Sequence, residues 1–122
     1  MASNFEFYSP TRVIFGKGTE QRVGALVREY GGTRVLIVYG GKSAPPPRTL
    51  GGVVPNPHLD KVYEGIRIGK ENSIDFLLAV GGGSVIDTAK AIAYGLAEPE
   101  KDVWELYEHT RTARKCLPVA SI

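Results

Sequence analysis

The chain has 122 residues, of which 43% are hydrophobic, a proportion that suits one packed domain and excludes a disordered segment. Its 15 basic and 13 acidic side chains leave a net charge of +2, which gives no indication of a nucleic-acid or membrane partner. No apolar run is long enough to cross a membrane, and residues 1–10 lack the pattern of a signal peptide, so a cytoplasmic protein is expected.

Strand and helix patterns alternate along the chain. Apolar or β-branched runs predict strands at residues 11–15, 35–39, 74–80 and 117–122. Apolar side chains at helical spacing predict a helix capped by Thr19, one that begins at Asn56-Pro57, one after the glycines at 81–83, and a short one at 103–108. The runs at 35–39 and 74–80 are apolar throughout, which is typical of strands buried on both faces. The alternation predicts an α/β fold with a Rossmann-like, doubly wound parallel sheet.

One segment, GGKSAPPPRTLGG at residues 40–52, interrupts this alternation. Its three consecutive prolines cannot lie inside a helix or a central strand. A crossover between parallel strands normally takes a dozen or more residues, most of them helical, yet no helical periodicity is present here. We therefore expect irregular structure over residues 42–52 and an incomplete doubly wound sheet from which one crossover helix is missing.

The stretch LLAVGGGSVIDTAKAIA contains three consecutive glycines between a buried strand and a helix. Glycine raises the entropic cost of folding, so Gly81, Gly82 and Gly83 indicate a ligand that approaches the backbone closely. Ser84 can cap the helix, and Asp87 completes a capping box. A helix N-terminus with free N–H groups suits phosphate, which makes this run the first candidate site. The alternative is a tight turn between packed elements, and the run does not satisfy GxGxxG.

A second candidate site follows the preceding strand, in VLIVYGGKS. A P-loop is disfavoured because it needs glycine at position 36, where Leu36 stands, and because prolines follow instead of a helix. In a dinucleotide-binding fold this position reads the adenosine ribose. No acid stands among Gly40, Gly41, Lys42 and Ser43, which predicts that NADP is accepted as well as NAD. The alternative for Lys42 is a solvated loop lysine.

Other reactive side chains show no pattern of a site. His58 and His109 lack the spacing of metal ligands with another His, Cys, Asp or Glu. Cys116 is the only cysteine, so no internal disulfide can form, and it is interpreted as a small core residue rather than a nucleophile.

Four phrases together resemble the N-terminal half of iron-containing alcohol dehydrogenases, in the butanol-dehydrogenase-like branch: NFEFYSPTRVIFGKGT, VLIVYGG, GGVVPNPHLDKVYEGI and DFLLAVGGGSVIDTAKAIA. The resemblance implies that residues 1–122 form an N-terminal NAD(P)-binding domain that is truncated. It implies that residues 81–84 hold the pyrophosphate and that Asp87 lies near the nicotinamide side. Gly40 matches the position where some members carry the acid that selects NAD.

The resemblance also implies the chemistry of the parent enzymes, which is hydride transfer between NAD or NADP and a primary alcohol or its aldehyde. Those enzymes bind iron or zinc through an aspartate and histidines that have no counterpart in this chain, so no catalytic or metal-binding residue is assigned. They also carry roughly 15 to 20 residues more where this chain has APPPRTL. This chain alone is expected to be inactive. Whether it forms a homo-oligomer is left open. The alternative is a non-catalytic nucleotide-binding fragment or an inert gene remnant.

Overall fold

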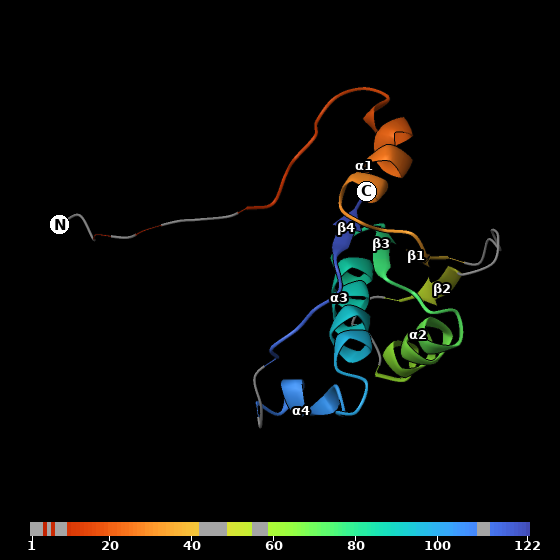
Figure 1. Ribbon diagram of the computed structural model, residues 1–122, viewed down its shortest axis with the longest axis vertical. Helices are drawn as coiled ribbons and strands as arrows, with labels where there is room; N and C mark the ends of the chain where they lie inside the picture. Colours follow the sequence, from red (N-terminus) through yellow and green to blue (C-terminus); the bar gives the residue numbers. More distant parts are fainter. Residues whose placement is uncertain (1–3, 5, 7–9, 42–48, 55–58, 110–112) are drawn as a thin grey trace.

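The computed structural model describes residues 4, 6, 10–41, 49–54, 59–109 and 113–122. Four parallel strands form one sheet in the order β2–β1–β3–β4 (Figure 1). The strands are β1 (Val35–Gly40), β2 (Thr49–Val53), β3 (Phe76–Val80) and β4 (Val119–Ser121). The helices are η1, a 3₁₀ turn (Thr19–Arg22), α1 (Val23–Glu29), α2 (Leu59–Glu71), α3 (Gly83–Ala97) and α4 (Trp104–Tyr107). The predicted α/β class with a parallel sheet is confirmed.

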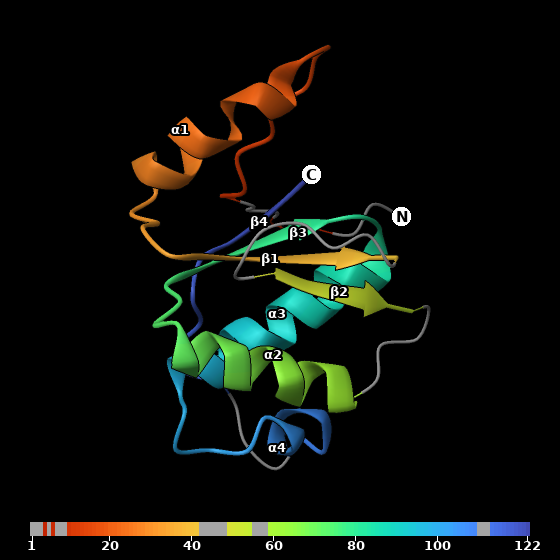
Figure 2. The ribbon, with the colours of Figure 1, turned by 90° about the vertical axis from the view of Figure 1, so that its right-hand side faces the viewer.

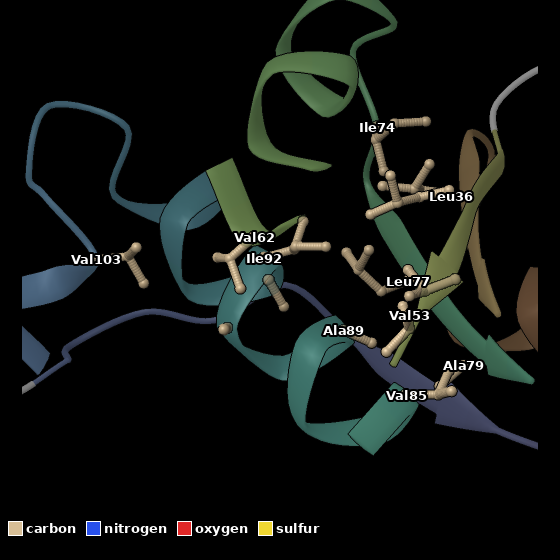
Figure 3. Close-up of a cluster of buried hydrophobic side chains, with 14 residues drawn as sticks. Leu36, Val53, Val62, Ile74, Leu77, Ala79, Val85, Ala89, Ile92 and Val103 are labelled. Carbon is tan, nitrogen blue, oxygen red and sulfur yellow. The ribbon is translucent and has the colours of Figure 1, made fainter. Parts of the chain in front are cut away.

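The main core lies between the sheet and the two long helices α2 and α3, which cover the same face (Figure 2). Leu36 and Leu77 point from the strands toward Val62 of α2 and Ile92 of α3 (Figure 3). These four side chains have at most 1% of their surface exposed. Their burial removes apolar surface from water, which is the main favourable term in folding.

Glycines let α2 and α3 pack closely. A Cβ atom at Gly65 would lie 2.3 Å from Cδ1 of Ile92, and one at Gly95 would lie 2.3 Å from Cδ1 of Ile66. A larger residue at either position would therefore push the helices apart. This close contact joins α2 and α3 into one layer on the sheet.

Right-handed crossovers decide which face of the sheet each connection covers. The chain moves from β2 past β1 to β3 and then to β4, so α2 and α3 lie on one face. From β1 to β2 it moves in the opposite direction, so a right-handed connection there runs over the other face. Only residues 41–48 make this connection, and residues 42–48 lie outside the described residues. The sheet resumes at Thr49, so residues 49–52 differ from the irregular structure expected for 42–52.

The face opposite α2 and α3 is covered unevenly. In β1, Leu36 and Val38 are fully buried, whereas the alternate residues Val35, Ile37 and Tyr39 are only half-buried. In β3, residues 76–79 are buried on both faces. The prediction of burial on both faces is therefore confirmed for β3 and wrong for β1. Helix α1 lies on this other side but stands away from the strands (Figure 2).

The strand predicted at residues 11–15 is wrong. This segment has no strand structure and extends away from the sheet (Figure 1). Val13 and Phe15 are 81% and 98% exposed. A β-branched run forms a strand only where a partner strand accepts its hydrogen bonds, and none of the described strands lies beside it. Thr19 does not cap a helix either, because its Oγ1 donates a hydrogen bond to the carbonyl of Gly16 at 2.9 Å.

Two polar contacts join elements that are distant in sequence. The Asp75 carboxylate, at the start of β3, accepts hydrogen bonds from the backbone N–H groups of Thr33 and Arg34 at 3.0 and 2.9 Å. Partial burial raises the pKa of Asp75, but the hydrogen bond donated by the Thr33 hydroxyl and those from the two N–H groups outweigh it and hold that pKa below its ordinary value. The Tyr63 hydroxyl of α2 donates to Asp102 at 2.5 Å, which raises the pKa of Tyr63 to about 12.

Candidate functional site

The strand order creates a crevice at the carboxyl ends of β1 and β3. These two strands are neighbours, yet the chain leaves β1 toward β2 on one side and leaves β3 toward β4 on the other. In open α/β sheets, ligands bind at this kind of topological switch point. Both glycine runs singled out in the sequence lie at these carboxyl ends: Gly40 is the last residue of β1 and Gly41 follows it, and residues 81–83 follow β3. Tyr39 and Val80 are partners in the sheet, so the two runs begin side by side.

The structure explains why glycine is needed at only one of the three positions after β3. Gly81 has a φ of +145°, and a Cβ there would lie 2.8 Å from Cγ2 of Val85, so the fold itself requires glycine. Gly82 and Gly83 have no positive φ, and a Cβ at either would meet no atom of the protein within 4 Å. Packing and backbone conformation therefore do not explain the second and third glycines. They leave open space directly over the start of α3.

The first turn of α3 offers hydrogen-bond donors to this space. Helix α3 begins at Gly83, and its N-cap residue Gly82 provides no side-chain cap. The N–H groups of Val85 and Ile86 donate to the carbonyl of Gly82, both at 3.1 Å, whereas those of Gly83 and Ser84 have no acceptor among the described residues. Free N–H groups at the start of a 15-residue helix carry partial positive charge. This arrangement fits a phosphate group that bare backbone allows to approach.

The predicted capping box is wrong. Ser84 is the second residue of α3 and not its cap, because the helix begins at Gly83, two residues earlier than a cap at Ser84 would give. Its carbonyl accepts a hydrogen bond from Oγ1 of Thr88 at 2.8 Å. Asp87 is exposed and lies beyond the first turn of α3, so it does not complete a cap.

The second candidate run lies against the first. A Cβ at Gly40 would lie 3.9 Å from Cγ2 of Val85, the side chain that also touches Gly81, and 3.3 Å from the carbonyl oxygen of Val53. Gly41 has a φ of +90°, and its carbonyl accepts a hydrogen bond from the N–H of Gly52 at 2.9 Å. The structure therefore brings residues 40, 41 and 81–84 together. Lys42 and Ser43 lie outside the described residues.

Sequence reasoning missed a pocket of about 250 Å³ beside the end of β2. Its walls include Gly52 of β2, the charged residues Asp60, Lys61 and Glu64 of α2, and Thr88 of α3. In the sequence, Lys61 and Glu64 show only the spacing of a surface ion pair on a helix, which carries no information about a site. Only the packing of α2 beside α3 places them at the carboxyl edge of the sheet.

The described residues provide no site for iron or zinc. No group of three or more His, Cys, Asp and Glu side chains converges among them. Cys116 is exposed, so its interpretation as a core residue is wrong; partial burial of its thiol raises the pKa, which disfavours the reactive thiolate. Within the described part of the chain, no helix is both long and apolar enough to span a membrane.

The sequence model of iron-containing alcohol dehydrogenases matches residues 10–122. The chain belongs to this family. A probable NADH-dependent butanol dehydrogenase 2 from Bacillus subtilis is 40% identical over 136 residues, which covers 98% of this chain and 34% of the relative. The NADPH-dependent aldehyde reductase YqhD from Escherichia coli is 34% identical over 122 residues, covering 87% of this chain and 31% of the relative. The chain therefore spans about a third of the length of these relatives.

A solved structure shows the same fold over almost the whole chain. The NADH-dependent butanol dehydrogenase A from Thermotoga maritima has a TM-score of 0.86 at 33% identity, covering 97% of this chain and 34% of that protein. The match to the Bacillus subtilis protein extends over 136 residues, whereas this chain has 122. That relative therefore contains at least 14 residues within the matched region that this chain lacks.

Proposed function

We propose that this chain is the dinucleotide-binding part of a metal-dependent alcohol dehydrogenase that uses NAD or NADP to interconvert a primary alcohol and its aldehyde. One observation carries the proposal. Gly82 and Gly83 lie at the topological switch point, and neither the backbone conformation nor the packing requires glycine there. Family membership supports the assignment to this class of enzyme.

Each group in the crevice has a part in binding. The N–H groups of Gly83 and Ser84 donate to the pyrophosphate, and the dipole of α3 stabilises its charge. Gly40 and Gly41 allow the adenosine ribose to approach the end of β1. Asp87, exposed on α3, lies on the nicotinamide side. The bound nicotinamide supplies the hydride chemistry, while the alcohol, the metal and the catalytic groups belong to the two thirds of the relatives' length that this chain does not match.

The same reasoning suggests where the additional residues of the relative lie. Between β1 and β2 this chain has only residues 41–48, fewer than a parallel crossover normally takes. A helix in that connection would cover the face on which Val35, Ile37 and Tyr39 are only half-buried. We therefore assign the missing 14 or more residues to this crossover, which makes residues 1–122 a truncated nucleotide-binding domain.

Two measurements on the purified chain test the proposal. Titration with NADH and NADPH, followed by nicotinamide fluorescence, should show saturable binding of at least one of them. Alcohol oxidation should stay at background with either oxidised cofactor, with or without added iron or zinc, because no catalytic residue is assigned to this chain.

The outcomes separate the proposal from its alternative. Binding without turnover supports a nucleotide-binding part of a larger enzyme. If a folded chain binds neither cofactor, the proposed function is wrong and an inert remnant is the better description. Metal-dependent turnover by this chain alone would show that the catalytic groups lie within residues 1–122 and that their assignment to the unmatched part of the relatives is wrong.

A further inference from the structure

The side chain of Val85, in the first turn of α3, lies between the two glycine runs of the crevice. A Cβ at Gly81 would lie 2.8 Å from its Cγ2, and a Cβ at Gly40 would lie 3.9 Å from the same methyl group. Among the described residues, Val85 is the one side chain that a Cβ would meet within 4 Å at both positions. Val85 is buried in the main core, so its packed neighbours hold these methyl groups in place.

Backbone hydrogen bonds fasten the two runs toward opposite edges of the sheet. The N–H of Gly81 donates to the carbonyl of Ile122, next to the end of β4, at 3.1 Å. The carbonyl of Gly41 accepts from the N–H of Gly52 in β2 at 2.9 Å. Strands β4 and β2 are the two outer strands of the sheet. The spacing between the runs therefore depends on the side chain that both of them contact.

Valine has the shape of a fixed spacer. Its two methyl groups on Cβ leave one strongly preferred χ1 rotamer in a helix. Gly40 and Gly81 have no side chains that could fill a gap left at position 85. A smaller residue there leaves a cavity into which the bare backbone of either run can move, and a larger one pushes the runs apart.

We propose that Val85 is a positioning residue that sets the distance between residues 40–41 and 81–83 and thereby the affinity for a dinucleotide that spans them. The buried side chain acts through the backbone of both runs and does not itself contact the cofactor. This inference rests on the proposed function, because the spacing matters only if a dinucleotide occupies the switch point. The spacing affects the part that NAD and NADP share, so both cofactors respond equally.

The test measures the affinity of the full chain and of three Val85 variants for NADH and NADPH by fluorescence titration. Val85→Ala should weaken both cofactors by about tenfold at an unchanged ratio, because the preformed spacing is lost. Val85→Ile adds a methyl group and should also weaken both, and it keeps the test decisive if Val85→Ala does not fold. Val85→Thr keeps the branched shape but buries a hydroxyl, so it should lower the melting temperature and retain both affinities within about twofold.

Val103→Ala is the matched control. Val103 is also buried, the substitution removes the same two methyl groups, and Val103 lies at the opposite end of the buried cluster from Val85 (Figure 3). This variant should lower the melting temperature and leave both affinities unchanged. Amide NMR spectra without cofactor give a second readout. Val85→Ala should shift the signals of Gly40 and Gly81 together, and Val103→Ala should shift neither.

Each result supports or overturns the spacer. Weaker binding in Val85→Ala and Val85→Ile, with binding retained in Val85→Thr, supports it, because affinity then follows the shape of the side chain and not the stability of the fold. Equal loss of affinity in Val85→Ala and Val103→Ala overturns it. A shift of the Gly81 signal without that of Gly40 also overturns it, since Val85 then supports one run alone. If the unchanged chain melts cooperatively but binds neither cofactor, the proposed function fails first and the inference fails with it.

Discussion

Gly83→Ala separates a glycine kept for the fold from one kept for a ligand. A methyl group at position 83 meets no atom of the protein within 4 Å, and the backbone there is helical. Replacing glycine by alanine at a compatible position stabilises a protein by about 0.4–1 kcal/mol, mainly by restricting the unfolded chain. The melting temperature of the variant should therefore stay the same or rise by a few degrees.

Cofactor binding should change in the opposite direction. The methyl group occupies the open space over the free N–H groups of Gly83 and Ser84, where the pyrophosphate is proposed to lie. We expect the affinity for NADH to fall by about tenfold, which corresponds to about 1.4 kcal/mol. Thermal unfolding and fluorescence titration on the same preparation measure the two effects separately.

Gly24→Ala is the matched control. Gly24 lies in α1, its Cβ would also meet no atom within 4 Å, and α1 stands away from the switch point (Figure 2). This variant should gain stability in the same way and bind NADH unchanged. If Gly83→Ala binds NADH as tightly as Gly24→Ala does, the glycine run serves the turn alone and the reasoning from open space is refuted.

Three further perturbations test other parts of the structure. Gly40→Asp should lower the affinity for NADPH by about tenfold and leave that for NADH unchanged, although its Cβ would lie 3.3 Å from the carbonyl oxygen of Val53. If paired titrations give an unchanged ratio of the two affinities, the adenosine ribose lies elsewhere. Asp75→Asn should cost about 1 kcal/mol at pH 7. The folded pKa of Asp75 lies below its ordinary 3.8, so the stabilisation is present above pH 3.8 and is lost as the pH falls from there through the folded pKa. The difference in melting temperature from the unchanged chain should shrink over that range, and a constant difference contradicts the hydrogen bonds. Tyr63→Phe removes the hydrogen bond to Asp102. Because the folded pKa of Tyr63 is raised from 10.0 to about 12, this hydrogen bond should stabilise the fold fully below pH 10 and stop doing so as the pH rises through 12. Melting curves of both proteins and ultraviolet titration of the phenol check this.

The features that the sequence predicted correctly depend on local periodicity. Apolar side chains of α3 recur at helical spacing, and three of them, Val85, Ala89 and Ile92, lie in the core. The continuous apolar run of β3 is buried on both faces as expected. Such patterns reflect the geometry of a single element against a core, so they can be read without knowing its neighbours.

The features that the sequence did not predict depend on neighbours. The run at residues 11–15 has the composition of a strand, but no described strand pairs with it. Ser84 has the residue type of a cap, yet α3 begins before it, with Gly82 in the extended conformation of an N-cap residue. Lys61 and Glu64 resemble an ordinary surface pair until α2 packs beside the end of β2.

The short connection between β1 and β2 affects the stability of the domain but not the geometry of the proposed binding site. On the proposed assignment, Val35, Ile37 and Tyr39 are only half-buried because a crossover helix does not cover them. Each of these side chains then forgoes part of the roughly 1.5–3 kcal/mol that full burial would contribute. The switch point, however, depends only on the directions in which the chain leaves β1 and β3, and the short connection still carries the chain from β1 to β2. The open space over Gly82 and Gly83 lies at the start of α3, which packs beside α2 on the face of the sheet away from the half-buried side chains of β1. The proposed loss of the crossover helix would therefore reduce the stability of the domain and leave the glycine crevice in place.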